Sequence, residues 1–230
     1  MPFYYYFDPT MLIVLPAIIF TFWAQINVNS TYSKYSKVMT SRRITGFEAA
    51  RRILDANGLY DVKIERVSGH LTDHYDPRAN VIRLSDAVHD SPSAAAVGVA
   101  AHEAGHAVQY AKSYAPIKIR QSIIPVTRIG SMMAMPLFII GIFFAMVELM
   151  WVGIAFYAAA LVFQLVTLPV EFNASRRAME ALEGSSILSS DELKASRKVL
   201  TAAALTYVAA LAASLLSLLR LIVIANSRRD

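Results

Sequence analysis

Residues 129–170 read IGSMMAMPLFIIGIFFAMVELMWVGIAFYAAALVFQLVTLPV, and Glu148 is the one charged side chain in this stretch. A helix needs about 20 apolar residues to cross a bilayer, so the stretch is long enough for two crossings. Glu148 lies near the middle, where a tight turn between two helices would meet water. The sequence therefore predicts a transmembrane helical hairpin over residues 129–170.

Two further uncharged stretches extend this pattern outward, one at about Met11–Ile26 and one between Lys198 and Arg220. Of the 230 residues, 56% are hydrophobic and 17% are charged, whereas a soluble domain carries about 25% charged residues. This composition excludes an ordinary soluble globule and a disordered tail. The chain has no cysteine, which excludes disulfide scaffolds and thiolate metal sites.

The basic residues indicate an orientation, because short loops rich in Lys and Arg stay in the cytoplasm. Of the 22 Lys and Arg residues, 14 lie between the first and second spans and five lie between the third and fourth. We therefore expect the N-terminus outside and both basic segments inside, although the last three Arg residues then fall outside. Because the basic residues are scattered beside apolar spans, the net charge of +5 predicts contact with a membrane surface and no nucleic-acid partner.

The polar segment over residues 29–128 can form a folded domain outside the membrane. Thr45 and Glu48 form a capping box that begins a helix. An Ala-rich helix is expected over Ser93–Tyr110. Strand-like runs lie between these helices, at Val62–Val67, Leu71–Tyr75 and Val81–Leu84.

The Ala-rich helix carries the motif HEAGH at residues 102–106. His102 and His106 are four residues apart, so both imidazoles project from one helix face and can bind one metal ion. Glu103 lies beside His102, close enough to act as general base without being a ligand. The alternative is a chance match, but burying two imidazoles and a carboxylate on an Ala/Val helix is costly without a metal. The HExxH motif therefore predicts a metallopeptidase site.

A catalytic zinc ion needs three protein ligands and one open position. No histidine follows His106, so the third ligand is expected to be a carboxylate. Glu171 is the first carboxylate after the hairpin, and two membrane crossings return the chain to the face that carries HEAGH. We expect one Zn²⁺ per chain, with Glu171 as third ligand. Glu180 and Glu183 are rivals, and Glu171 could instead cap a helix at the membrane boundary.

Four segments together resemble the YugP-type bacterial neutral zinc metallopeptidases over nearly the whole chain: GHLTDHYDPR (69–78), HEAGH, YAPIKIRQSIIPV (114–126) and PVEFNASRRA (169–178). More distantly, the order of metal helix, membrane hairpin and Glu-Phe-x-Ala is similar to the membrane gluzincins of the HtpX and Ste24 type. This resemblance implies that Glu171 is a zinc ligand. The gluzincin motif usually has Asp where this chain has Ser175, so we expect Asn173 or Asp73 to orient a zinc-bound histidine.

These observations predict a mainly α integral membrane protein with about four transmembrane helices and a small α+β zincin-like catalytic domain. We expect it in the bacterial plasma membrane, with the catalytic domain cytoplasmic. The expected parts are an N-terminal anchor (1–28), a catalytic domain (29–128), the transmembrane hairpin (129–170), a third-ligand helix with a cytoplasmic segment (171–198) and a C-terminal transmembrane helix (199–227).

The predicted function is a zinc endopeptidase that cuts unfolded or membrane-associated polypeptides at the cytoplasmic face. One alternative is an intramembrane protease of the site-2 type, which charges close to the HEAGH helix disfavour. Another is a non-catalytic, metal-stabilised membrane scaffold, which needs no general base such as Glu103. Expected partners are a polypeptide substrate and the bilayer, and a membrane adaptor or a second copy of the chain is compatible with the pattern.

The oxyanion donor is left open among His74, Tyr75 and Tyr110. The run Leu71–Tyr75 should pair with Val81–Leu84 as a β-hairpin whose free edge binds substrate as an added strand, through an outward main-chain group at Thr72 or His74. The alternative is a hairpin that only packs against the metal helix.

Overall fold

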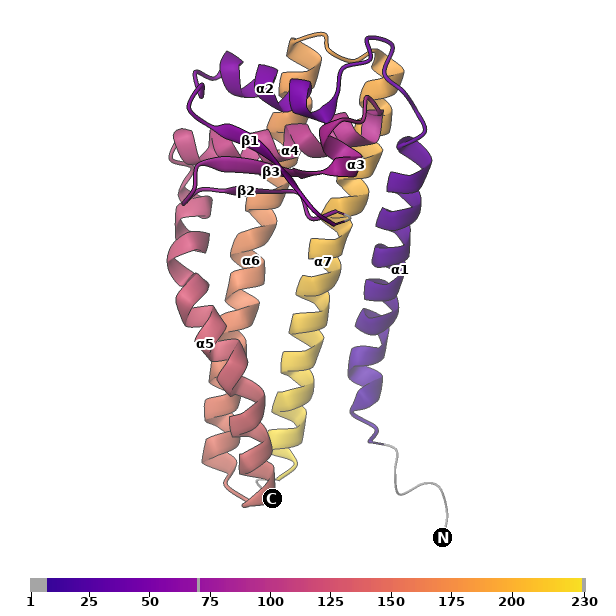
Figure 1. Cartoon of the computed structure of the whole chain (residues 1–230). Coiled ribbons are helices and arrows are strands. Elements are labelled where there is room, and N and C mark those ends of the chain that lie inside the picture. The colour runs from indigo at the N-terminus through magenta and orange to yellow at the C-terminus, as the bar shows by residue number, and fades with distance from the viewer. Residues whose placement is uncertain (1–7, 70, 229–230) are drawn as a thin grey trace. The chain divides into compact units, whose positions relative to one another are not determined.

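The chain is described here from a computed structural model, which places residues 8–69 and 71–228; residues 1–7 of the predicted anchor lie outside this range (Figure 1). Over the described residues the protein is mainly α-helical with one small sheet, as predicted. The helices are α1 (Met11–Tyr35), α2 (Gly46–Ala56), α3 (Asp86–His89), α4 (Ala94–Ala111), α5 (Ala115–Phe143), α6 (Val147–Gly184) and α7 (Ser190–Asn226), and the strands are β1 (Lys63–Val67), β2 (His74–Asp76) and β3 (Val81–Ser85).

Among the described helices, α1, α5, α6 and α7 are long and apolar enough to cross a membrane. They cover the four uncharged stretches, which confirms the predicted number of candidate membrane helices. Each helix is longer than its uncharged stretch. In particular, α6 continues without a break past Glu171 to Gly184, so one helix carries both a membrane span and the predicted third ligand.

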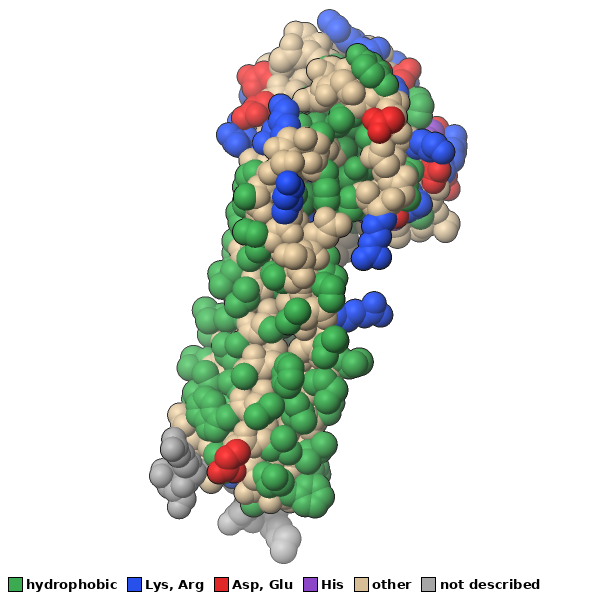
Figure 2. Space-filling model, turned by 90° about the vertical axis from the view of Figure 1, so that its left-hand side faces the viewer, with side chains coloured by type: hydrophobic (Ala, Val, Ile, Leu, Met, Phe, Trp, Pro, Cys, Tyr) green, Lys and Arg blue, Asp and Glu red, His purple; other side chains and the backbone are tan. Residues whose placement is uncertain are grey.

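By its contacts the chain forms two compact units. The first consists of Met1–Ala24, Ile119–Thr167 and Thr206–Asp230, and its core includes Phe138, Met150 and Leu221. On the face shown in Figure 2, hydrophobic side chains cover the helices of this unit and charged ones are sparse. Phe143 is 81% exposed, and such an apolar surface suits contact with lipid.

The second unit, Gln25–Lys118 with Leu168–Leu205, contains the small α+β structure. Its sheet has the order β1-β3-β2, with β1 parallel and β2 antiparallel to β3, so β2 lies at an edge (Figure 1). The central strand β3 is buried, and α2 packs against α4. The core that joins these elements includes the fully buried side chains of Leu54, Ile82, Leu84, Val97 and Leu182.

The predicted hairpin is present, but its first strand is shorter and shifted along the chain. Strand β2 begins at His74 and not at Leu71. Leu71 has a φ angle of 56° and Gly69 one of 118°, and a β-strand does not adopt these left-handed conformations. The carboxylate of Asp73 accepts hydrogen bonds from the Ser85 N–H at 2.7 Å and the Ser85 hydroxyl at 3.1 Å. These bonds stabilise a turn at residues where the sequence pattern predicted a strand.

A close approach of α4 and α6 depends on Gly105. A Cβ atom at this position would lie 2.6 Å from the carbonyl oxygen of Ala174 on α6. Real Cβ atoms do not approach backbone this closely, so the two helices can pack at this distance only with glycine. Gly105 therefore brings the backbone of α6 against the helix that carries His102 and His106.

We expect Gly105→Ala to destabilise the second unit by about 1–3 kcal/mol, because the added methyl group forces the backbones of α4 and α6 apart. The matched control is Gly184→Ala, where an added Cβ meets no atom within 4 Å. That change should alter the free energy of unfolding by less than about 0.5 kcal/mol. Thermal unfolding of both variants in detergent measures the difference, and equal melting temperatures would contradict this account of the helix contact.

Candidate metal centre

The two histidines of the HEAGH motif lie on one face of α4. Ser93 caps the helix, since its hydroxyl accepts a hydrogen bond from the Ala96 N–H at 3.2 Å. His102 and His106 are four residues apart in the sequence, and the centres of their rings lie 4.7 Å apart. The capped, Ala-rich helix thus holds both imidazoles next to each other, as the i, i+4 spacing predicts.

Glu171 reaches this pair from α6. Its Oε2 atom lies 3.3 Å from Nε2 of His102 and 3.6 Å from Nε2 of His106. Each of the three residues offers a ligand atom, and these atoms all lie within 4.8 Å of one another. The structure therefore brings together the three residues that the sequence analysis proposed as ligands.

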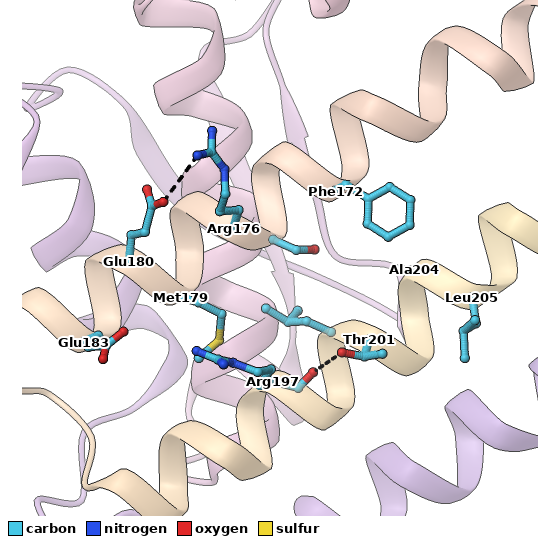
Figure 3. A pocket seen from close by; sticks show the side chains of 11 residues that line it. Phe172, Arg176, Met179, Glu180, Glu183, Arg197, Thr201, Ala204 and Leu205 are labelled. Carbon is cyan, nitrogen blue, oxygen red and sulfur yellow. Dashed lines mark hydrogen bonds and ion pairs between the residues drawn. The ribbon is translucent and has the colours of Figure 1, made fainter.

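The two rival carboxylates lie elsewhere on α6. Glu180 is exposed and pairs with Arg176 at 3.6 Å. Glu180 and Glu183 both line a cavity between α6 and α7 (Figure 3). By contrast, Glu171 is 3% exposed, so its charge is buried against the histidines. The geometry therefore favours Glu171 over both rivals.

The donor set fits a zinc ion. Tetrahedral zinc with bonds of about 2.0–2.2 Å places neighbouring ligand atoms about 3.3–3.6 Å apart. The distances from Glu171 Oε2 to the two imidazole nitrogens, 3.3 and 3.6 Å, match that spacing. Two imidazoles and one carboxylate also form a ligand set that leaves the fourth zinc position open, as catalysis requires.

Glu103 is buried beside these residues, with 8% of its surface exposed. Its carboxylate forms no hydrogen bond or ion pair with residues 8–69 and 71–228. Burying a carboxylate without such a partner is costly. Both oxygens are therefore available to a water molecule or a substrate group, which suits a general base.

Ser175 supplies a contact that the sequence analysis expected from another residue. Its hydroxyl lies 3.1 Å from Nδ1 of His102. When Nε2 of His102 faces a metal, the proton lies on Nδ1, which donates it to the Ser175 hydroxyl. Ser175 thus occupies the position of the usual Asp and makes the orienting contact itself. Of the two residues expected to orient a zinc-bound histidine, Asp73 is bonded to Ser85 instead, and Asn173 belongs to the contacts around His106.

Gln109 orients the second histidine, and the sequence analysis missed this role. Its side-chain oxygen lies 3.0 Å from Nδ1 of His106, while its amide donates to the Val170 carbonyl at 2.8 Å and to Asn173 Oδ1 at 3.0 Å. Arg177 Nε donates to the same Asn173 oxygen at 2.8 Å. Asn173 therefore supports His106 through Gln109. The i, i+3 spacing of His106 and Gln109 on one helix was the signal in the sequence.

The carboxylates around His106 raise its pKa. Burial lowers the pKa of this imidazole, but the neighbouring Glu171 and Glu103 outweigh burial and hold the pKa above its ordinary value. Only the neutral imidazole binds a metal. A metal ion at this site would therefore compete with the proton on His106.

Of the residues proposed for substrate contact, His74 and Tyr75 lie on β2 and Tyr110 lies on α4. His74 is exposed, and its Nδ1 donates to the Thr72 carbonyl at 2.8 Å. The Tyr75 hydroxyl donates to Asn80 at 3.0 Å, and its ring lies 5.5 Å from the ring of Tyr110, one turn after His106. Thr72 lies outside β2, so of the two proposed edge residues only His74 belongs to the strand.

We expect Ser175→Ala to weaken zinc binding or activity by about 10–100-fold, the usual effect of removing a partner that orients a metal-bound histidine. Ser175→Asp should keep binding near the wild-type level, because a carboxylate accepts the same Nδ1–H. The control is Ser185→Ala, since that hydroxyl donates to the Ala181 and Leu182 carbonyls at the end of α6, away from the ligand group. Zinc titration against a chelating dye measures all three, and equal affinity of Ser175→Ala and wild type would rule out the orienting role.

The cavity between α6 and α7 adjoins the contact between Ser175 and His102. Its volume is about 440 Å³, and Ser175 lines it together with apolar side chains such as Phe172 and Leu205 (Figure 3). Ser175 bonds to Nδ1 of His102, whereas Nε2 is the nitrogen that faces Glu171. The cavity thus lies on the side of His102 away from the proposed ligand atoms.

An HExxH helix with its buried Glu103 and a second glutamate from a later helix form an arrangement typical of zinc metallopeptidases, here in a protein with membrane-length helices. The chain belongs to the family described as "Putative neutral zinc metallopeptidase", whose model matches residues 10–226. A relative from Bacillus subtilis (strain 168), described as "Putative membrane protease YugP", is 47% identical over 220 residues, which cover 96% of this chain and 98% of the relative. No solved structure matches the chain. The resemblance seen in the sequence is confirmed.

Proposed function

We propose that this protein is a membrane-bound zinc endopeptidase that hydrolyses unfolded or membrane-associated polypeptides at the cytoplasmic face. The observation that carries the proposal is the group formed by His102, His106 and Glu171 next to the buried carboxylate of Glu103. Membership of the zinc metallopeptidase family supports both the metal and the reaction class. The HEAGH helix α4 is not among the described helices that are long and apolar enough to cross a membrane.

In the proposed reaction His102, His106 and Glu171 would hold one zinc ion. Zinc in such a site lowers the pKa of a water molecule and polarises the carbonyl that is attacked. Glu103 takes the proton of the attacking water and then delivers it to the leaving amine. Ser175 and Gln109 keep the two imidazoles in position throughout. These roles, two histidines and one glutamate as ligands and a second glutamate as general base, are those of a gluzincin.

The oxyanion that develops during attack needs a hydrogen-bond donor. The proton of the Tyr75 hydroxyl is already donated to Asn80. Nδ1 of His74 likewise donates its proton, to the Thr72 carbonyl. The donor therefore stays open among His74, Tyr75 and Tyr110. His74 is exposed on the edge strand, and Tyr110 lies on the same helix as the metal ligands.

The edge position of β2 supports the proposed substrate class. β2 pairs with β3 on one side only, and it packs against α4. The unpaired side of an edge strand can bind any extended chain through main-chain groups, with little dependence on its sequence. Folded proteins do not offer such an extended segment, so an enzyme that uses β2 in this way should act on unfolded chains.

The purified full-length chain in detergent tests the function. With zinc present it should hydrolyse a permanently unfolded protein and leave a compact folded protein intact. Chelation should stop hydrolysis and added zinc should restore it. A zinc-loaded protein that cleaves neither substrate would favour the metal-stabilised scaffold, and hydrolysis that survives removal of the metal would contradict the proposed mechanism.

The proposed orientation has a separate test, which the absence of native cysteine simplifies. Phe144 in the turn between α5 and α6 is 72% exposed, and Tyr60 after α2 is 74% exposed, so single cysteines at these positions form a matched pair. In intact cells, an impermeant thiol reagent should label Phe144→Cys strongly and spare Tyr60→Cys, which should react only after lysis. The reverse pattern would place the metal centre outside the cytoplasm.

A further inference from the structure

A second cavity, of about 490 Å³, lies between the last turns of α1 and the first turns of α7, wholly within the second unit. Four cationic side chains line it: Lys34, Lys194, Arg197 and Lys198. None of the described residues that line it is acidic. The cavity is therefore a concentrated positive field at one end of two membrane-length helices.

Most of this positive charge has no carboxylate partner. The ammonium groups of Lys34 and Lys198 come from different helices, yet they lie 5.5 and 5.9 Å from the centre of the same Tyr35 ring. Lys194 pairs with the exposed Asp191 at 2.9 Å, whereas the guanidinium of Arg197 forms no ion pair with the described part of the chain. Like charges gathered in this way repel one another, and a bound anion would relieve the repulsion.

Neutral hydrogen-bonding groups line the same cavity. Asn27 and Thr31 lie one turn apart on α1, and Thr201 faces them from α7. Within the described residues, the side chains of Asn27 and Thr31 form no hydrogen bond. Amide and hydroxyl groups next to Lys and Arg are the usual partners of phosphate oxygens.

The cavity beside Ser175 provides an internal comparison. Arg197, Thr201 and Leu205 line both cavities, so the two adjoin along α7. In the Ser175 cavity, however, Glu180 and Glu183 accompany the arginines, and Arg176 is paired with Glu180 (Figure 3). Of these two adjoining cavities, the one between α1 and α7 is therefore the one whose described lining is cationic without acid.

The surroundings of this cavity indicate a lipid as the source of the anion. Both helices continue from it into stretches that are apolar enough to cross a membrane. Ile26, next to Asn27 on α1, is 67% exposed, and Leu205 lines the cavity itself. Basic pockets between transmembrane helices bind anionic headgroups. We propose that this cavity binds the phosphate of an anionic glycerophospholipid headgroup and thereby joins α1 to α7.

Binding is tested with the full-length protein in detergent micelles, titrated with phosphatidylglycerol and followed by native mass spectrometry. Phosphatidylglycerol should bind tightly, phosphatidylcholine should not, and soluble inorganic phosphate should compete poorly. Each Lys or Arg near an anionic surface contributes about a fivefold factor in affinity, so Arg197→Gln with Lys198→Gln should weaken binding about 25-fold. The matched control, Arg52→Gln with Lys63→Gln, removes the same charge from exposed positions outside the cavity and should leave the affinity unchanged.

A substitution that keeps the charge distinguishes a defined binding site from general electrostatic attraction. Thr31→Val removes a hydroxyl without changing charge and should weaken phosphatidylglycerol binding severalfold, while zinc content and thermal stability without lipid stay at the wild-type level. Equal losses in the cavity double variant and the control double variant would overturn the proposal, because the attraction would then be diffuse. Unchanged binding by Thr31→Val, or equally tight binding of free phosphate, would also overturn it.

Discussion

Replacing Glu103 with Gln should lower peptide hydrolysis by at least about 10²–10⁴-fold, because the amide cannot accept the proton of the attacking water. The substitution keeps the size of the side chain and leaves His102, His106 and Glu171 unchanged. Zinc content and melting temperature should therefore remain near wild type. The measurements are initial rates on an unfolded protein, zinc analysis and thermal unfolding of the same preparations.

Glu180→Gln is the matched control for this change. Glu180 is exposed, and its partner is the exposed Arg176. Its replacement should change the rate less than twofold, because the side chain lies outside the ligand group. If Glu103→Gln turned over substrate at a rate comparable to wild type, the assignment of the general base would be wrong.

Replacing Glu171 with Ala should remove most of the bound zinc. Glu171 Oε2 lies within 3.6 Å of both imidazoles, and its removal leaves two neutral imidazoles and no anionic ligand. The loss of affinity should exceed the roughly 10–100-fold effect that removal of an orienting partner such as Ser175 produces. Zinc analysis after dialysis, together with titration against a chelating dye, gives the change in affinity.

Glu180→Ala and Glu183→Ala serve as controls for the third ligand. Both side chains line the cavity between α6 and α7 and do not belong to the ligand group. Both variants should keep their zinc. If Glu171→Ala kept its full zinc content and either control lost zinc, the assignment of Glu171 as third ligand would be wrong.

The predictions for Glu103 and Ser175 address different parts of the centre. Loss of Glu103 should affect the rate and spare the metal, whereas loss of Ser175 should weaken the hold on His102 and hence the metal. The chain places Ser175 where the related motif has Asp, and the observed contact of 3.1 Å shows that a hydroxyl reaches the same imidazole nitrogen. A carboxylate accepts the same Nδ1–H, so Ser175→Asp tests whether an accepting group at this position, and not serine itself, holds His102 in place.

Local sequence patterns were sufficient for much of the fold. Uncharged stretches predict membrane-length helices because a bilayer penalises charge over a known thickness. The capping box at Thr45 and Glu48 is present at the start of α2, since both of its hydrogen bonds form within four residues. The i, i+4 spacing of His102 and His106 likewise places both rings on one face of α4 without help from the rest of the chain.

The sequence by itself thus determined the helical class, the four candidate spans and the paired imidazoles, because each depends on neighbours along the chain. Only the tertiary structure decided which carboxylate joins the histidines and which groups orient them. Ser175 and Gln109 act through contacts between α4 and α6, and the close approach at Gly105 permits those contacts. The start of β2 also depends on a residue distant in sequence. Asp73 bonds to Ser85, and the strand begins only after it, at His74. Packing between segments far apart in sequence leaves no periodic signal, so these features could not be read from residue spacing.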